Sequence, residues 1–192
     1  QASDSTAKRG FVLVFVLAIV MRLPFLATEP ILSDDIFRYV WDGRVQHAGI
    51  NPYLYAPDAE QLVFLRNDLY PRINNKDIPT IYPPAMEWVF YVAIAISESL
   101  WFMKALFVLC DLALILVLSG ILRALGLNPV RAVIYAWSPL VIVEVAGSGH
   151  NDTLAVLGLF AAQWALLRHR DALSMALLTL SGLAKVVGYT LA

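Results

Sequence analysis

Residues 101–123 read WFMKALFVLCDLALILVLSGILR, and this stretch decides the class of the fold. A helix that crosses a membrane needs about 20 mainly apolar residues, and the stretch is long enough. Before its final arginine it contains two charged residues, Lys104 and Asp111. Because a charge inside a bilayer is costly, such residues usually face the bundle interior and find a partner there. The stretch therefore predicts a membrane-spanning helix that packs against other helices.

The composition of the whole chain agrees with this prediction. The 192 residues are 59% hydrophobic and 15% charged, with a formal net charge of −1. Soluble domains average about 25% charged residues, and disordered chains combine low hydrophobicity with high net charge. The absence of a basic surplus argues against a nucleic-acid partner. A single cysteine, Cys110, excludes an intrachain disulfide and a cysteine metal cage. The sequence predicts an all-α, polytopic membrane helix bundle.

Four further apolar segments come close to the length of a span. With 101–123, the expected spans are 10–27, 132–147, 153–168 and 172–191. Arg22 and Lys104 lie near span ends, where long side chains can reach the interface. We interpret residues 1–192 as one membrane domain. We also expect a fragment of a longer protein, because the sequence begins with Gln1 and stops inside an apolar run.

A sixth apolar stretch, 85–97, is shorter, and it decides the topology. Cytoplasmic loops of membrane proteins are enriched in lysine and arginine. If 85–97 does not cross, one group of basic residues can be cytoplasmic together: Lys8, Arg9, Arg123, Arg131, Arg168 and Arg170. We therefore expect 85–97 to form an interfacial or re-entrant helix. The loops 28–84 and 147–152 then face the same, extracytoplasmic side and can meet.

The loop 28–84 is too rich in charged and aromatic residues for a plain connection, and we expect it to contain short helices. Loops longer than about 15 residues are usually functional or disordered. Its segment 33–44 reads SDDIFRYVWDGR. Ser33 can cap a helix, and two acids in the first turn suit the positive end of the helix dipole. The segment predicts a helix that starts as the chain leaves the membrane.

The acids of this segment are the candidate catalytic residues. Helical spacing places Asp34, Arg38 and Asp42 on one stripe, and Asp35 with Tyr39 on the next. Two adjacent carboxylates at the membrane face can share a proton or bind a cation, and one can act as a base. The alternative is a capped surface helix whose salt bridges contribute little.

Polar residues elsewhere complete the candidate site. In the loop 147–152, His150 is a proton carrier or metal ligand by type, while Asp152 can serve the site or cap the next helix. Lys185, in the outer half of the last expected span, can hold a phosphate as a point charge. The remaining candidate substrate-binding residues are Arg38, Tyr39, Asp42, Arg44, Asn51, Tyr53 and Tyr82. A plain turn explains the Asn-Pro at 51–52 at least as well.

No phosphate loop, dinucleotide-binding glycine motif, zinc pattern or Gly-x-Ser-x-Gly elbow occurs in the sequence. No cofactor is therefore expected, and a divalent cation at Asp34, Asp35 and Asp152 stays open as an alternative. A transporter is one alternative function, with Asp111, Glu144 and Lys185 along its path. A non-catalytic subunit of a membrane assembly is another.

The order of these features resembles a known family. One span is followed by a loop that opens with Asp34-Asp35 and closes with Tyr-Pro-Pro at 82–84, and a second loop carries His-Asn-Asp at 150–152. This pattern is similar to the membrane-integral GT-C glycosyltransferases. The nearest branches are the bacterial polyprenyl-phosphate-mannose-dependent mannosyltransferases and the first mannosyltransferase of GPI-anchor assembly. The segments 104–107, 111–112 and 183–185 add to the resemblance.

The resemblance implies the front half of a GT-C-type fold, in a multi-pass protein of the plasma membrane. It implies transfer of a hexose, mannose above all, from a polyprenyl-phosphate sugar to a hydroxyl group of a glycolipid or glycan acceptor. The transfer would take place at the extracytoplasmic face. Asp34 or Asp35 would be the base on that hydroxyl group, and Lys185 would meet the donor phosphate. His150 and Asp152 would complete the active site.

Overall fold

The computed structural model describes residues 2–30 and 32–185. Within these ranges the protein is helical and contains no strand, which confirms the all-α prediction. The α-helices are α1 (Ala2–Leu26), α2 (Asp35–His47), α3 (Pro84–Ile96), α4 (Leu100–Ala124), α5 (Val133–Ala136), α6 (Pro139–Ile142), α7 (Asp152–Leu167) and α8 (Asp171–Ala184). The 3₁₀ helices are η1 (Glu60–Leu65), η2 (Tyr70–Arg72) and η3 (Pro129–Ala132), and η4 (Val143–Ser148) is a π-helix.

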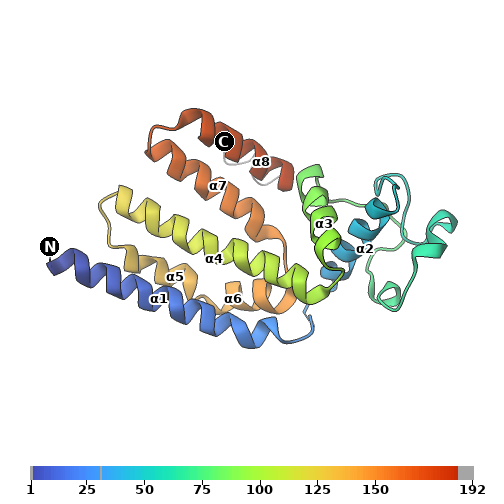
Figure 1. Ribbon diagram of the computed structural model, residues 1–192, viewed down its shortest axis with the longest axis horizontal. Coiled ribbons are helices and arrows are strands. Elements are labelled where there is room, and N and C mark those ends of the chain that lie inside the picture. Colours follow the sequence, from blue (N-terminus) through green and yellow to red (C-terminus); the bar gives the residue numbers. More distant parts are fainter. Residues whose placement is uncertain (1, 31, 186–192) are drawn as a thin grey trace.

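The long helices form a bundle, and the candidate site lies at one end of it. α1, α4, α7 and α8 run along the long axis of the molecule, while α2 and α3 lie at one end (Figure 1). α7 and α8 form an antiparallel pair, and α4 packs against α7. The N-terminus and the loops that follow α4 and α7 lie at the opposite end. The arginines of these two loops therefore gather away from α2 and α3.

Two of the helices are long and apolar enough to cross a membrane. They are the Ser5–Leu26 part of α1 and Leu100–Ala124, which is α4. α7 and α8, which correspond to the last two expected spans, are apolar but have only 16 and 14 residues. They are shorter than the usual span of about 20 residues. Residues 186–191 of the last expected span lie outside the described residues.

The expected span 132–147 is broken in the structure. Pro129–Ala136 and Pro139–Ser148 form two helical pieces that are bent by 61° at the break. Proline has no backbone N–H and disfavours a helical conformation for the residue before it. Ser138 is accordingly extended, with ψ 119°, two residues after the first piece ends at Ala136. The expected span 132–147 corresponds to this bent pair, whose two pieces can form at most one span.

A buried ion pair joins α1 to α4, as the sequence suggested for Asp111. Arg22 Nε donates to the Asp111 carboxylate, and Tyr135 Oη donates to its second oxygen at 2.7 Å. Arg22 Nη1 also donates to the carbonyl oxygen of Ala136 at 2.9 Å, which holds the broken span against α1. Arg22 is only 1% exposed. It does not reach the interface as expected, because its charge is compensated inside the bundle.

Lys104 is also buried rather than extended toward the interface. Its Nζ donates to the carbonyl oxygens of Phe25 and Thr28, at 2.8 and 2.7 Å. Both carbonyls lie at the end of α1, and Phe25 O also accepts the backbone N–H of Thr28 at 3.2 Å. The lysine thus fixes the point at which the chain leaves α1 and turns toward α2.

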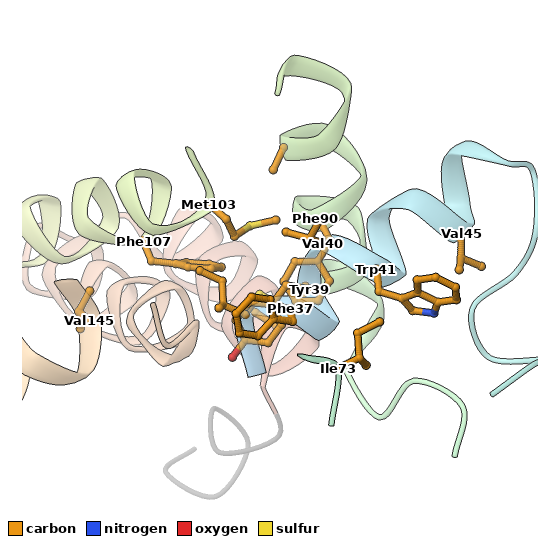
Figure 2. Packing of buried hydrophobic residues seen from close by; sticks show 14 of the residues in the cluster. Phe37, Tyr39, Val40, Trp41, Val45, Ile73, Phe90, Met103, Phe107 and Val145 are labelled. Atoms are coloured by element: carbon orange, nitrogen blue, oxygen red, sulfur yellow. The ribbon is translucent and has the colours of Figure 1, made fainter. Parts of the chain in front are cut away.

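The core under the candidate site is aromatic. The ring of Tyr39 on α2 stacks on Phe90 of α3 with a centroid distance of 4.8 Å, and meets the edge of Phe107 of α4 at 5.9 Å. Figure 2 shows these rings together between the three helices. Gly43 allows the close approach, since a Cβ there would lie 2.8 Å from the Phe90 carbonyl oxygen. α2 is therefore held rigidly against α3 and α4.

Candidate active site

The two adjacent acids lie where α2 begins. Asp34 is the residue before the first turn, Asp35 opens the helix, and Ser33 Oγ accepts the N–H of Asp35 at 3.3 Å. Asn74, from the far part of the long loop, bridges the acids. Its Nδ2 donates to Asp34 Oδ1 at 2.8 Å and to Asp35 Oδ1 at 2.6 Å. No pattern in the sequence points to Asn74, because only the tertiary fold brings it to α2.

The structure separates the two acids by what they face. Asp35 lines a cavity of about 390 Å³, together with Tyr82 and Lys185. Asp34 lines a different and more open cavity, which Arg72 also lines. The cavity volume falls in the range of small-molecule sites, which is roughly 300–1,000 Å³. Asp35 is therefore the acid that a bound ligand can meet in this cavity.

The second loop, residues 147–152, places a histidine near Asp35. The sequence predicts that the two loops can meet, because both are expected on the same side of the membrane. His150 Nε2 lies 3.9 Å from Asp35 Oδ2, and His150 Nδ1 lies 2.8 Å from Glu144 Oε2. A carboxylate can only accept a hydrogen bond, so Nδ1 carries the proton in this contact. The three side chains form a row of Glu144, His150 and Asp35. All three are partly exposed, at 37%, 27% and 40%.

The backbone around His150 explains why the row forms. Gly149 has φ +78°, and a Cβ there would lie 2.6 Å from a carbon of Ile36. A side chain would thus be strained and would clash, and only glycine lets the loop pack onto α2. Glu144 lies on η4, and π-helical turns are frequent at functional sites. In the sequence, Glu144 stands out only as a carboxylate inside an apolar segment. Such residues are often functional, so this position is the signal that could have predicted its place in the site.

A cation, Lys185, lines the same cavity as Asp35. Lys185 follows α8 and pairs with the Asp152 carboxylate at the start of α7. Asn151 also lines the cavity, and its buried Nδ2 has no hydrogen-bond partner among residues 2–30 and 32–185. The candidate residues that meet at this cavity or beside it are Asp35, Arg38, Tyr82, His150, Asp152 and Lys185.

Arg38 and Asp42 form the ion pair that their spacing predicts, but both are buried. Arg38 Nε donates to Asp42 Oδ1 at 2.9 Å. The remaining guanidinium nitrogens donate to the carbonyl oxygens of Asn75 and Ile78, at 3.1 and 3.0 Å. Asp42 is 1% exposed and does not line the cavity. These contacts hold the 75–78 segment against α2, so they favour a supporting role for the pair.

A second buried carboxyl group lies beside Asp42. Glu87 of α3 is 3% exposed, and it accepts hydrogen bonds from Thr80 Oγ1 and Gln46 Nε2, both at 2.8 Å. Burial and, second to it, the neighbouring Asp42 carboxylate together raise the pKa of Glu87 to about 8. Burial also raises the pKa of Asp42 to about 6, against the opposite effect of Arg38. Glu87 is therefore mostly protonated at neutral pH.

The other candidate residues do not meet at the cavity. Tyr39 is 1% exposed in the aromatic core, and burial, with nearby carboxylates, raises the pKa of its hydroxyl group above the usual value. Arg44 points to the other end of α2, where it pairs with Glu98. Asn51 and Tyr53 line a separate cavity on the far side of the 82–84 segment. Tyr39 and Arg44 lie on α2 but not at the first cavity, and Asn51 and Tyr53 follow α2 in the chain. Their role in substrate binding stays a prediction.

The sequence leaves open whether a divalent cation binds at Asp34, Asp35 and Asp152. Among the described residues, no group of three or more His, Cys, Asp or Glu side chains is arranged to hold a metal ion. Asp152 is engaged with Lys185 rather than with Asp34 or Asp35. In the structure these acids therefore make hydrogen bonds and ion pairs with nitrogen donors.

Comparisons with known proteins identify a family. Residues 3–192 match the MptA_B family, described as "Alpha-(1->6)-mannopyranosyltransferase, N-terminal domain". The comparison with curated proteins and the comparison with solved structures gave no match. The family match covers the bundle, the long loop and the cavity together.

Proposed function

The chain belongs to the alpha-(1->6)-mannopyranosyltransferase family, and from this premise we propose that it carries the reacting centre for mannosyl transfer from a polyprenyl-phosphate donor. The acceptor is a glycan or glycolipid hydroxyl group. The proposal goes beyond the family match in naming the donor, the residues and the side of the membrane. The cavity beside Asp35, His150 and Lys185 is the observation that carries it.

Asp35 is the base in this proposal. Its Oδ1 accepts from Asn74, while Oδ2 lies toward His150 and lines a cavity of about 390 Å³. A general base must lie within hydrogen-bond reach of the proton that it takes. Asp34 also accepts a hydrogen bond from Asn74 but lines a different cavity. It therefore positions the Asn74 side-chain amide and not the acceptor hydroxyl group.

Lys185 meets the phosphate of the donor. In the transfer, the acceptor oxygen forms a bond to C1 of mannose while the bond between C1 and the phosphate oxygen breaks. The hydroxyl proton passes to Asp35, and polyprenyl phosphate leaves with the electron pair. A cation near the departing oxygen stabilises the charge that develops there. Lys185 and the unpartnered Nδ2 of Asn151 line the same cavity as Asp35, which supports this role.

The site faces the extracytoplasmic side of the plasma membrane in this proposal. The loops that follow α4 and α7, which carry arginines in the sequence, lie at the end of the bundle opposite to α2 and α3. Cytoplasmic ends carry the excess of lysine and arginine. A lipid-linked donor also requires a site at the level of the membrane surface, and α2 begins a few residues after the first spanning helix.

The test compares the two acids in membranes that contain the full-length protein. Transfer of mannose from polyprenyl-phosphate mannose is measured for the unmutated protein, Asp35→Asn and Asp34→Asn at equal protein level. Loss of a general base lowers the rate by roughly 10²–10⁴-fold, and we expect this for Asp35→Asn. Asp34→Asn keeps the oxygen that accepts from Asn74, so its rate should stay within a few-fold.

The outcomes separate the parts of the proposal. Equal rates for Asp35→Asn and the unmutated protein would remove Asp35 from the mechanism. A loss in Asp34→Asn alone would exchange the roles of the two acids. An unmutated protein that transfers no mannose from this donor would overturn the donor assignment.

A further inference from the structure

A second cavity lies beside the first one, on the outer face of α2 and α3. Its volume is about 470 Å³, and its wall carries three aromatic and three polar side chains: Tyr53, Trp88, Tyr91, Gln46, Asn51 and Glu87. The mechanism proposed above uses none of them. A concave site of this size with a few polar groups is the usual form of a ligand site.

The two cavities adjoin across one segment of the long loop. Tyr82 and Pro83 line the first cavity, and Pro84 lines the second. Tyr53 Oη donates to the carbonyl oxygen of Tyr82 at 2.6 Å, which fixes the Tyr53 ring beside this segment. The 82–84 segment thus borders both cavities, and a ligand that occupies both has to cross this segment.

The aromatic rings of the second cavity are exposed although they are apolar. Trp88 is 67% exposed, Tyr53 is 42% exposed and Tyr91 is 37% exposed. Trp88 and Tyr91 meet edge to face with a centroid distance of 6.0 Å, and His47 stacks on Tyr91 at 4.2 Å. These contacts hold the Tyr91 ring in place. Fixed aromatic faces offer a large apolar contact area at a low entropy cost.

Hydrogen-bonding groups stand beside the rings without carrying a net charge at neutral pH. Asn51 Oδ1 accepts the N–H of Tyr53 at 2.9 Å, and its Nδ2 makes no hydrogen bond within the described part of the chain. Gln46 Nε2 donates to the Glu87 carboxyl group, which lies at the base of the cavity. Amides and hydroxyl groups next to an aromatic face match a pyranose ring, which has an apolar C–H face and a polar rim.

We infer that the second cavity binds the inner sugar residues of an α-(1→6)-linked manno-oligosaccharide acceptor, while its terminal residue occupies the first cavity. The inference rests on the proposed function for the direction of the chain and for the linkage, but the cavity itself is independent of the catalytic residues. Trp88 supplies the main stacking face, since it is the most exposed of the three rings.

The test compares acceptors of different length with the full-length protein in membranes. Mannose transfer is measured to an α-(1→6)-linked disaccharide and to the corresponding hexasaccharide. Trp88→Ala should raise KM for the hexasaccharide roughly 10-fold, and leave KM for the disaccharide and both kcat values within about two-fold. Trp88→Phe keeps an aromatic face and should recover most of the affinity.

Phe64→Ala is the matched control. Phe64 is an aromatic side chain of η1 that is 71% exposed, as Trp88 of α3 is strongly exposed, but it does not line the cavity. We expect KM for both acceptors to stay unchanged. Equal KM changes for the two acceptor lengths in Trp88→Ala, or an unchanged hexasaccharide KM, would overturn the inference. The KM change in Trp88→Ala is also measured at several contents of anionic lipid. If anionic lipid removes this change while the dependence of KM on acceptor length stays constant, Trp88 contacts the membrane surface and not the acceptor.

A binding measurement separates this inference from the proposed function. Binding of the hexasaccharide is measured by isothermal titration calorimetry for the detergent-solubilised protein and for Trp88→Ala, without a donor. Binding lost in Trp88→Ala supports the second cavity even if polyprenyl-phosphate mannose is not the donor. The inference would be overturned if mannose transfer proceeds with a KM that does not depend on acceptor length and the second cavity binds no saccharide. The proposed function would then stay intact.

Discussion

The buried carboxyl group of Glu87 should make the stability of the protein depend on pH. Burial, and then the Asp42 carboxylate, raise the pKa of Glu87 from 4.5 to about 8 in the folded protein. Since the folded-state pKa exceeds the unfolded value, the stabilisation is fully present below pH 4.5. It is lost as the pH rises through about 8. From pH 6 to the folded-state pKa, two pH units higher, the free energy of unfolding falls by roughly 1.4 kcal/mol per unit, or about 3 kcal/mol in total. This is the loss expected between pH 6 and pH 9.

Glu87→Gln should remove most of this pH dependence. The introduced amide is uncharged at every pH, but it has one acceptor oxygen where the carboxyl group has two. Thr80 or Gln46 therefore loses a partner, which costs about 1 kcal/mol at pH 6. Thermal unfolding in detergent micelles is followed by tryptophan fluorescence at pH 6, 7, 8 and 9. For a chain of this size, about 3 kcal/mol corresponds to a fall in Tm of roughly 6–12 °C.

Glu98→Gln is the control for this prediction, because Glu98 is an acid 41% exposed at the end of α3 and should keep the unmutated pH dependence. If Glu87→Gln loses as much Tm between pH 6 and pH 9 as the unmutated protein, other groups carry the titration. The assignment of the proton to the pair of Glu87 and Asp42 would then be refuted.

Three further predictions concern the helices and the second loop. Asp111→Asn leaves the buried guanidinium of Arg22 without its charge partner and should cost about 3–5 kcal/mol, measured by SDS-induced unfolding in micelles. Gly149→Ala meets both a positive φ and a clash, and should cost at least about 1–2 kcal/mol in the same measurement. Glu144→Gln loosens the orientation of His150 and should lower kcat for mannose transfer roughly 10-fold, with an unchanged KM for the donor in the same membrane assay.

Local features of the candidate site could be predicted because a helix fixes which neighbours meet. The spacing of Arg38 and Asp42 predicts their contact, since residues four apart lie on one face of a helix. The helix start near Ser33 follows from capping chemistry and from two acids that suit the helix dipole. An acid inside an apolar segment, such as Asp111, needs a partner within the bundle.

Contacts between distant segments could not be predicted in this way. Asn74 meets both acids across about 40 residues of irregular loop, and no periodicity links an asparagine to a helix so far away. Glu144 reaches His150 only because a π-helix and the positive φ of Gly149 shape the second loop. The packing of α2 against α3 and α4 decides that Asp35 faces the cavity while Asp34 does not.

The sequence by itself determined the all-helical, membrane-type class of the protein and the position of its acids at the start of α2. These properties follow from apolar length, charge and helical spacing, which act over a few residues. Only the tertiary structure decided that the expected span 132–147 is bent, that Arg22 joins Asp111, and that two cavities flank Tyr82. Such features depend on how side chains from distant segments fill space together, and close packing is a property of the whole fold.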